Sequence, residues 1–325
     1  MELDFAVRQE RTTLAKMRFS GPLRVQRPFY PEAAPRHAPG REFPSQPCHC
    51  CLLHPPGGLV SGDDLNLEVR LGQGAHALLT APSASKFYAA DSCNVAQRQT
   101  TGLYVTGGVL EWLPRETIIY DGARAEMRTS VDLDDASACI GWEMVCLGRP
   151  AAGERFTTGS VRQSLFVSRQ GMPLLHELLR FEAGDALQSG ACGLNGRPVA
   201  ATLFAVGRGP GAMGTTDQAD SDLAALESCC TTLQNMLAPD SDFDAAPEGQ
   251  NQISTGGCAP AAPLPLSAHA GERAGATVRG GVLVVRYLGP DMEEARNLLL
   301  TAWGLLRPAL TGCQPHMPRI WHGAF

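Results

Sequence analysis

The first two hundred residues contain short runs in which apolar and polar side chains alternate. In residues 65–71, four apolar side chains share one face of an extended chain and three polar side chains share the other. Gly72 and Gly74 then supply a turn, and residues 75–80 are expected to return as a paired strand. Similar runs occur at 102–105, 117–120, 123–133, 139–147, 161–167 and 199–206. Because Gly, Pro and Asp separate them without helical patterns between, we expect a mainly antiparallel β architecture.

Two α-helices are expected, and both lie late in the chain. The first begins at Ser221, a suitable N-cap, and its apolar residues recur at the three-and-four spacing of one buried face. The second begins near Asp291, which with Glu294 makes an acidic variant of the capping box. We expect Pro308 to end this helix, because proline cannot continue helical hydrogen bonding.

The segment between these helices has a different composition. Residues 238–276 are rich in Ala, Pro, Gly, Asp and Ser and show no sustained periodicity. Loops of this length are uncommon inside compact domains. We therefore expect a flexible insertion at 238–276 within a single domain that spans residues 1–325.

Charge and composition narrow the choice of partner and compartment. The chain has 27 basic and 33 acidic residues, a formal net charge of −6, and its arginines are interleaved with acids. A nucleic-acid groove needs clustered positive charge, so nucleic acid is not an expected partner. The charged N-terminus lacks the apolar run of a signal peptide, and no stretch approaches the ~18 apolar residues of a membrane span. We expect a cytoplasmic protein with reduced cysteines and no membrane partner.

Several unusual strings follow one another in a fixed order. They are LRVQRPFYPE at 23–32, CH at 48–49, LLHPPGGLVSGD at 52–63, TAP at 80–82, SKFY at 85–88, LEWLP at 110–114, ETI at 116–118, GWE at 141–143, LGRP at 147–150, GERF at 153–156, VVRYLG at 284–289 and PRIW at 318–321. Over residues 2–206 and 277–321 the chain resembles the UreD family of urease accessory proteins, also called UreH. It departs from that family within 80–89 and at Arg115, where glutamine is common.

This resemblance implies a mostly β, non-catalytic protein with one UreD-type domain. Together with the strand pattern, it predicts layered antiparallel β-sheets in a β-helix-like arrangement with two late α-helices. It also implies three partners, namely UreF, the nickel-carrying GTPase UreG, and apo-urease, on which the accessory proteins dock together. Nickel would be bound only in transit, along an internal path toward the urease active site.

Cys48, His49 and His54 form the most metal-like group, because thiolate and imidazole ligands both suit nickel. Adjacent Cys50 and Cys51 would point to opposite faces of a strand, and no second ligand pair follows at the spacing of a zinc site. A transient metal site is one hypothesis for this group. The alternative is a structural role, in which His54 hydrogen-bonds the turn at 55–58.

Acidic residues also lie within strings that we expect to be core structure. Asp63, Glu111 and Glu143 are the candidates for a polar path whose oxygens hold a divalent cation briefly. Carboxylates are almost never buried unpaired. The alternative is therefore that they form ordinary salt bridges with arginines such as Arg149.

Two other classes of function stay open at this point. A metal-dependent hydrolase would use the 48–54 region with nearby carboxylates, but a catalytic metal site needs three fixed ligands and an open position, and no such trio stands out. The other class is a partner-binding β module without a metal role. The glycine-rich string at 209–216 lacks the lysine of a P-loop, which argues against nucleotide binding.

Overall fold

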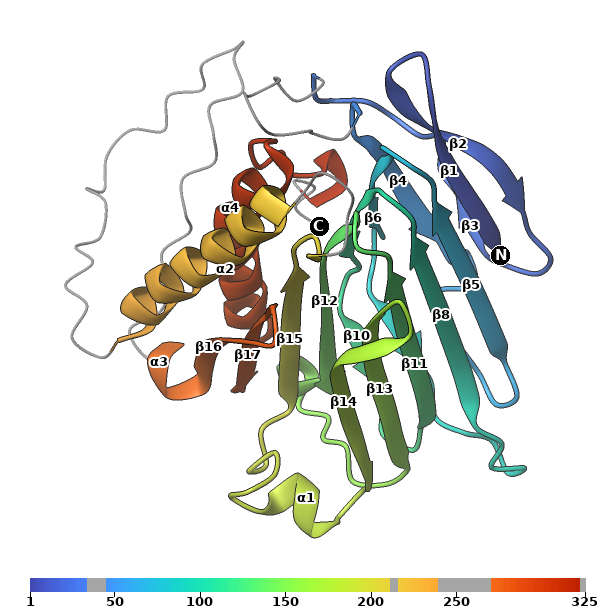
Figure 1. The fold of residues 1–325 in the computed structure, drawn as a ribbon. Helices are drawn as coiled ribbons and strands as arrows, with labels where there is room; N and C mark the ends of the chain where they lie inside the picture. Colours follow the sequence, from blue (N-terminus) through green and yellow to red (C-terminus); the bar gives the residue numbers. More distant parts are fainter. Residues whose placement is uncertain (34–44, 211–215, 239–269, 322–325) are drawn as a thin grey trace, which may run out of the picture.

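The computed structural model describes residues 1–33, 45–210, 216–238 and 270–321 (Figure 1). The strands form two β-sheets, and two long helices cover the outer face of the larger sheet. The mainly β class with two late helices is therefore confirmed. The predicted insertion at 238–276 lies largely outside the described residues. Its last residues form α3 (Ala270–Arg273) and the start of β16 (Ala274–Arg279).

The two sheets contain seven and ten strands. In spatial order, the seven-stranded sheet consists of β14 (Met172–Glu182), β13 (Ser160–Arg169), β11 (Arg124–Leu133), β8 (Gln97–Val105), β5 (Asp64–Leu71), β1 (Glu2–Arg8) and β2 (Arg11–Arg18). The ten-stranded sheet begins with β16 and continues with β17 (Val282–Gly289), β15 (Val199–Val206), β12 (Ala138–Leu147), β9 (Val109–Leu113), β6 (His76–Thr80), β4 (Cys48–Leu53) and β3 (Arg24–Val25). Beside β12 it also holds β10 (Thr117–Ile119) and β7 (Ser85–Phe87).

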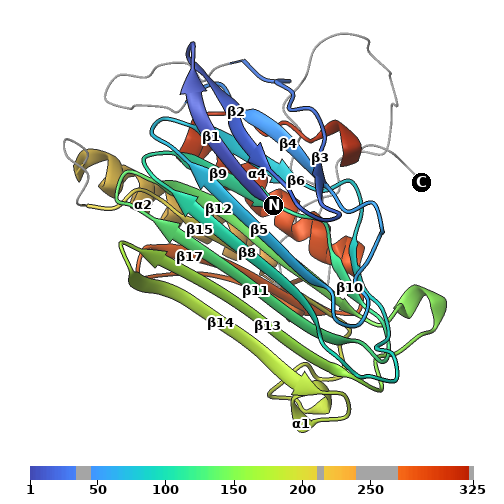
Figure 2. The same ribbon diagram turned by 90° about the vertical axis from the view of Figure 1, so that its right-hand side faces the viewer.

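From β4 to β13 the chain passes back and forth between the two layers, which Figure 2 shows one behind the other. The strands β5, β8, β11 and β13 are parallel neighbours in one sheet, and β4, β6, β9 and β12 are parallel neighbours in the other. Antiparallel pairs lie at the margins, for example between β1 and β2 and between β13 and β14. This part of the chain thus winds like a flattened β-helix. Its strand pairs are parallel, not antiparallel as the strand pattern predicted, whereas β12, β15 and β17 form antiparallel pairs within the ten-stranded sheet.

The turn at residues 72–74 explains this difference. Alternation shows which side chains share a face, but it does not identify the neighbouring strand, and a short glycine turn often joins two paired strands. Here the turn carries the chain from β5 in one sheet to β6 in the other. Accordingly, β5 pairs with β1 and β8, while β6 pairs with β4 and β9. A winding chain returns to each sheet in the same direction, so its strands are parallel.

The two long helices are α2 (Thr216–Leu237), which begins before the predicted Ser221, and α4 (Met292–Thr311). Asp291 is the N-cap of α4, and its side chain accepts a hydrogen bond from the Glu293 N–H at 2.7 Å. Pro308 does not end α4, contrary to prediction. Buried Leu310 and Thr311 extend the helix to Gly312, whose φ of 71° suits a glycine cap. None of the helices in the described part of the chain is both long and apolar enough to cross a membrane.

Three clusters of buried apolar side chains hold the layers together. One lies between the ten-stranded sheet and the long helices and includes Trp142 and Trp303. The other two lie between the sheets, one containing Phe5 and Leu103 and the other Phe156. The short elements at the periphery are α1 (Ala186–Ser189) and the 3₁₀ turns Pro150–Ala152 and Arg319–Trp321. The space between the sheets is therefore apolar at both ends, with an interruption that forms the candidate site.

Candidate functional site

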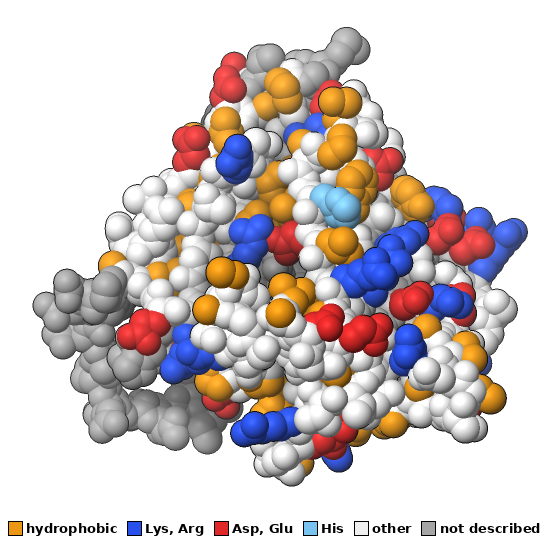
Figure 3. Space-filling model, turned by 90° about the horizontal axis from the view of Figure 1, so that it is seen from below, with side chains coloured by type: hydrophobic (Ala, Val, Ile, Leu, Met, Phe, Trp, Pro, Cys, Tyr) orange, Lys and Arg blue, Asp and Glu red, His pale blue; other side chains and the backbone are white. Residues whose placement is uncertain are grey.

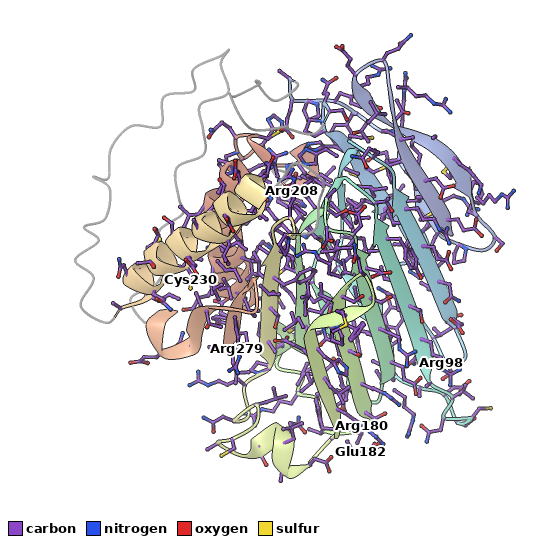
Figure 4. The ribbon with its side chains drawn as sticks, viewed as in Figure 1. Arg98, Arg180, Glu182, Arg208, Cys230 and Arg279 are labelled. Atoms are coloured by element: carbon purple, nitrogen blue, oxygen red, sulfur yellow. The ribbon has the colours of Figure 1, made fainter. Side chains whose placement is uncertain are left out.

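A row of polar side chains separates the two apolar clusters between the sheets. Thr101 of β8 lies opposite Thr129 of β11. Leu103 and Val131, two residues further along the same strands, are buried in the apolar core. Because alternate side chains of a strand share a face, both threonines also point inward. Figure 4 shows side chains from both sheets filling this space. We define the polar belt as Gln99, Thr101, Thr129, Glu143, Gln163, Glu177, Thr202 and Arg286.

Three adjoining cavities follow the polar belt. The first has a volume of about 90 Å³ and His54 on its wall. The second, of about 40 Å³, shares Trp112 and other wall residues with the first. The third, of about 360 Å³, shares Glu143 and Gln163 with the second and reaches Arg286. The second cavity is the smallest of the three.

Glu143 stands on the wall between the second and third cavities. It lies on β12 opposite Thr202 of β15, and Thr202 lies opposite Arg286 of β17. The Glu143 carboxylate accepts a hydrogen bond from Gln163 Nε2 at 2.6 Å. Burial raises the pKa of Glu143 above its usual value, and the nearby Glu177 carboxylate acts in the same direction. Hydrogen bonds from Thr129 and Gln163 oppose this shift. The ionised form of Glu143 would therefore be stabilised by a cation that enters the cavity.

Glu177 is the second carboxylate of the third cavity, and the sequence analysis missed it. It lies on β14, the terminal strand of its sheet, and accepts hydrogen bonds from Thr202 Oγ1 at 2.9 Å and Arg286 Nε at 2.7 Å. The Glu177 side chain is 24% exposed and the Arg286 side chain 54%, so this ion pair lies on the solvent-exposed side of the third cavity. The alternation with Leu179 and Phe181 is the signal that could have placed Glu177 inward.

Glu111 lies on the other face of the ten-stranded sheet, toward α4, and its side chain is fully buried. Its Oε1 accepts a hydrogen bond from His76 Nε2 at 2.7 Å, and its Oε2 accepts one from Trp303 Nε1 at 2.7 Å. Arg307 Nε lies 3.0 Å from both oxygens. Donors from β6 and α4 therefore occupy both oxygens of this β9 carboxylate.

Arg307 extends this arrangement to the segment that follows β3. Its two terminal nitrogens each donate a hydrogen bond to Glu32 at 2.7 Å, and one also donates to the carbonyl of Gln314. Glu32 in turn lies 2.5 Å from His49 Nε2. We define the buried ionic network as Glu32, His49, His76, Glu111, Trp303 and Arg307. Loss of one partner from such a network is costly, because another charge is left buried without compensation.

Two groups at the centre of this network have shifted pKa values. Burial alone would raise the pKa of Glu111, but Arg307, His76 and Trp303 lower it to about 2. Burial alone would lower the pKa of His76, but Cys313 and Glu111 raise it to about 9. His76 is therefore protonated at neutral pH and forms an ion pair with Glu111.

The protein should lose stability as the pH rises from about 6.5 to about 9. The folded state holds the His76 proton more tightly than the unfolded chain, so this stabilisation is complete below the unfolded pKa and is lost as the pH passes through the folded pKa. We expect a loss on the order of 3 kcal/mol at most. Urea unfolding at about pH 6, 7.5 and 9 measures it. His76→Asn should flatten the pH dependence, and an unchanged slope in that variant would contradict the assignment.

The predicted metal-like group is divided by the alternation of β4. Cys48 and Cys50 face the apolar core between the sheets, whereas His49 faces the helix side and contacts Glu32. Hydrogen bonding with Cys50 lowers the pKa of Cys48. Burial lowers the pKa of His54, which follows β4 and lies near Asp63. Cys48, His49 and His54 therefore do not converge on one point.

The three acidic candidates also lie in different places. Asp63 is in the turn before β5, where it accepts a hydrogen bond from the Val60 N–H at 2.9 Å. Glu111 faces α4, and Glu143 belongs to the polar belt. Within the described ranges, no three His, Cys, Asp or Glu side chains are placed to hold one metal ion together. The roles of these residues as nickel contacts stay predictions.

Comparison with known proteins identifies the family. The model of the family described as UreD urease accessory protein matches residues 1–322. A protein from Chromohalobacter salexigens named urease accessory protein UreD is 39% identical over 322 residues, covering 99% of this chain and 87% of the relative. Proteins of the same name from Alkalilimnicola ehrlichii and Marinobacter nauticus are 39% and 38% identical, over 99% of this chain and 90% and 91% of theirs. The chain therefore belongs to the UreD family of urease accessory proteins.

Proposed function

We propose that this chain is a non-catalytic scaffold of urease maturation. It works in the cytoplasm with UreF and the GTPase UreG, docks with them on apo-urease and helps to insert nickel into the active site. Membership of the UreD family and the names of the relatives support this proposal. A protein accessory to urease acts on the enzyme itself, so its working surfaces contact other proteins.

Within this role, nickel crosses the chain along the polar belt. The observation that carries this proposal is the row of adjoining cavities between the sheets, with Glu143 on the wall shared by two of them. Imidazole and thiolate ligands suit nickel better than carboxylate, amide or hydroxyl oxygens do. An oxygen-lined passage therefore holds the ion weakly, which allows the ion to leave again.

We infer different roles for the acidic candidates on this proposed route. Glu143 and Glu177 would contact the ion in the third cavity. Asp63 lies close to His54, a wall residue of the first cavity, and would contact the ion at that end. Glu111 is left out of the route, because it faces the helices and both of its oxygens already accept hydrogen bonds.

Co-expression of urease with UreF and UreG, with and without this chain, tests the proposed role. Urease made without the chain should accumulate to the same amount but contain little nickel and show little activity. Nickel per urease active site is the quantity to measure. Full loading of urease without the chain would contradict the proposal. Normal complex formation with no effect on nickel content would favour a β module without a metal role.

A further inference from the structure

The N-terminal corner of the molecule differs from the rest in charge. We define this corner as residues 1–27, which comprise the β1–β2 hairpin, β3 and their flanks. It contains six basic and three acidic residues, whereas the remainder contains 21 basic and 30 acidic residues. Figure 1 places the hairpin on the side of the molecule away from α2 and α3. On the face shown in Figure 3, by contrast, acidic and basic side chains are interspersed.

The basic side chains of this corner are largely free of acidic partners. Lys16 forms an ion pair with Asp4 at 3.3 Å. Arg8, Arg18 and Arg27 are exposed, and within the described part of the chain none of them forms an ion pair with a carboxylate. The positive potential of the corner is therefore not cancelled locally, and it would attract a negatively charged surface.

Exposed apolar side chains lie among these charges. Residues 16–21 are exposed without interruption. Within this run, Met17 is 44% and Phe19 49% exposed, and the Arg24 guanidinium lies over the Phe19 ring at 4.6 Å from its centre. Methionine, aromatic residues and arginine are the types enriched at protein interfaces.

The backbone adds a third feature. β2 is the terminal strand of the seven-stranded sheet. The first residues of β2 bridge to Gln46, whose carbonyl accepts a hydrogen bond from the Thr12 N–H. The second half of β2, which carries Met17, pairs with β1 on one edge and with no other strand of the described ranges on the other. An exposed strand edge can accept an additional segment by backbone hydrogen bonding.

We propose that the N-terminal corner docks an acidic surface of a protein partner, with an apolar side chain of that partner seated against Met17 and Phe19. Charge complementarity selects this occupant, because a second copy would bring two positive corners together. A nucleic acid would satisfy the arginines but leave Met17 and Phe19 without apolar contacts. The inference rests on the proposed function only for the identity of the partners to be tested, which are UreF, UreG and apo-urease.

The double variant Arg18→Glu/Phe19→Ser tests this inference in the full chain. Its matched control is Arg162→Glu/Met172→Ser, which makes the same kind of change at two exposed residues on β13 and β14 of the seven-stranded sheet. Binding of the wild type and both variants to each partner is titrated from about 50 to about 300 mM NaCl. We expect the corner variant to bind one of the partners at least about tenfold more weakly than the wild type at low salt. The difference in affinity between the two should be smaller at high salt. Thermal unfolding confirms that both variants are folded.

The outcomes separate the two proposals. If the wild type binds none of the three partners, the proposed function fails. If the wild type binds but the corner variant binds as tightly, or no more weakly than the control, the docking surface is disproved. Self-association of the wild type in sedimentation experiments that is lost in the corner variant would identify a second copy as the occupant and overturn the inference. Weakening by the corner variant alone, with the salt dependence stated, supports it.

Discussion

Replacing Glu111 by alanine should leave little folded protein. The replacement leaves the Trp303 N–H without its acceptor and leaves buried Arg307 with Glu32 as its remaining carboxylate partner. It also removes the charge that helps to keep buried His76 protonated. Removal of one partner from a buried ion pair typically costs about 3–5 kcal/mol. Single domains are stable by only about 5–15 kcal/mol, so this change removes much of the total.

Urea unfolding, together with the yield of folded protein, measures this loss. The control is Glu126→Ala, because Glu126 pairs with Arg98 at 3.0 Å but is 43% exposed, and exposed pairs contribute about 1 kcal/mol or less. Near wild-type stability of Glu111→Ala would show that the buried ionic network does not hold α4 on the sheet. Glu111 would then return as a candidate for the nickel route.

The double variant Glu143→Gln/Glu177→Gln should remove most nickel delivery, while each single change should reduce it in part. With one carboxylate left in the third cavity, the ion still has an anionic contact. With both replaced, Arg286 lacks its partner Glu177, and the cavity becomes positively charged. A like charge about 4 Å away costs between about 1 kcal/mol in bulk water and about 4 kcal/mol near a protein surface, so we expect a loss of at least about fivefold in nickel per urease active site.

Two comparisons make this result specific. Glu126→Gln/Glu182→Gln removes two exposed carboxylates from the seven-stranded sheet and should leave nickel loading unchanged. Assembly with the partners should be unchanged in all of these variants. If Cys48 instead held the ion, Cys48→Ser alone would abolish delivery and the carboxylate changes would do little. Full loading by the double glutamine variant would eliminate the polar belt as the route.

The individual strands and helices were predictable because their patterns are local. The alternation in residues 65–71 predicts β5, and the apolar spacing after Asp291 predicts α4. Pairing was not predictable, because the partner of β5 is β8, which lies one winding later in the chain. The end of α4 was misplaced at Pro308 because burial of Leu310 extends the helix beyond it. Tertiary packing overrides the local signal in both cases.

The candidate site was only partly predictable for the same reason. Glu143 stands out in the sequence as an acid within an apolar strand, and its side chain lines two of the cavities between the sheets. Thr101, Thr129 and Gln163 carry no signal one by one, since each is an ordinary residue for a half-exposed strand. They form a belt only when the parallel register brings them side by side. Glu111 has the same sequence signal as Glu143, but it lies on the opposite face of its sheet.

The winding of the chain also spreads the walls of the three cavities over most of the sequence. The walls begin at Leu23, just before β3, and end at Arg286 on β17. A chain that ends before β15 lacks one wall of the third cavity. If nickel crosses the protein as proposed, the complete route therefore requires strands drawn from nearly the whole sequence.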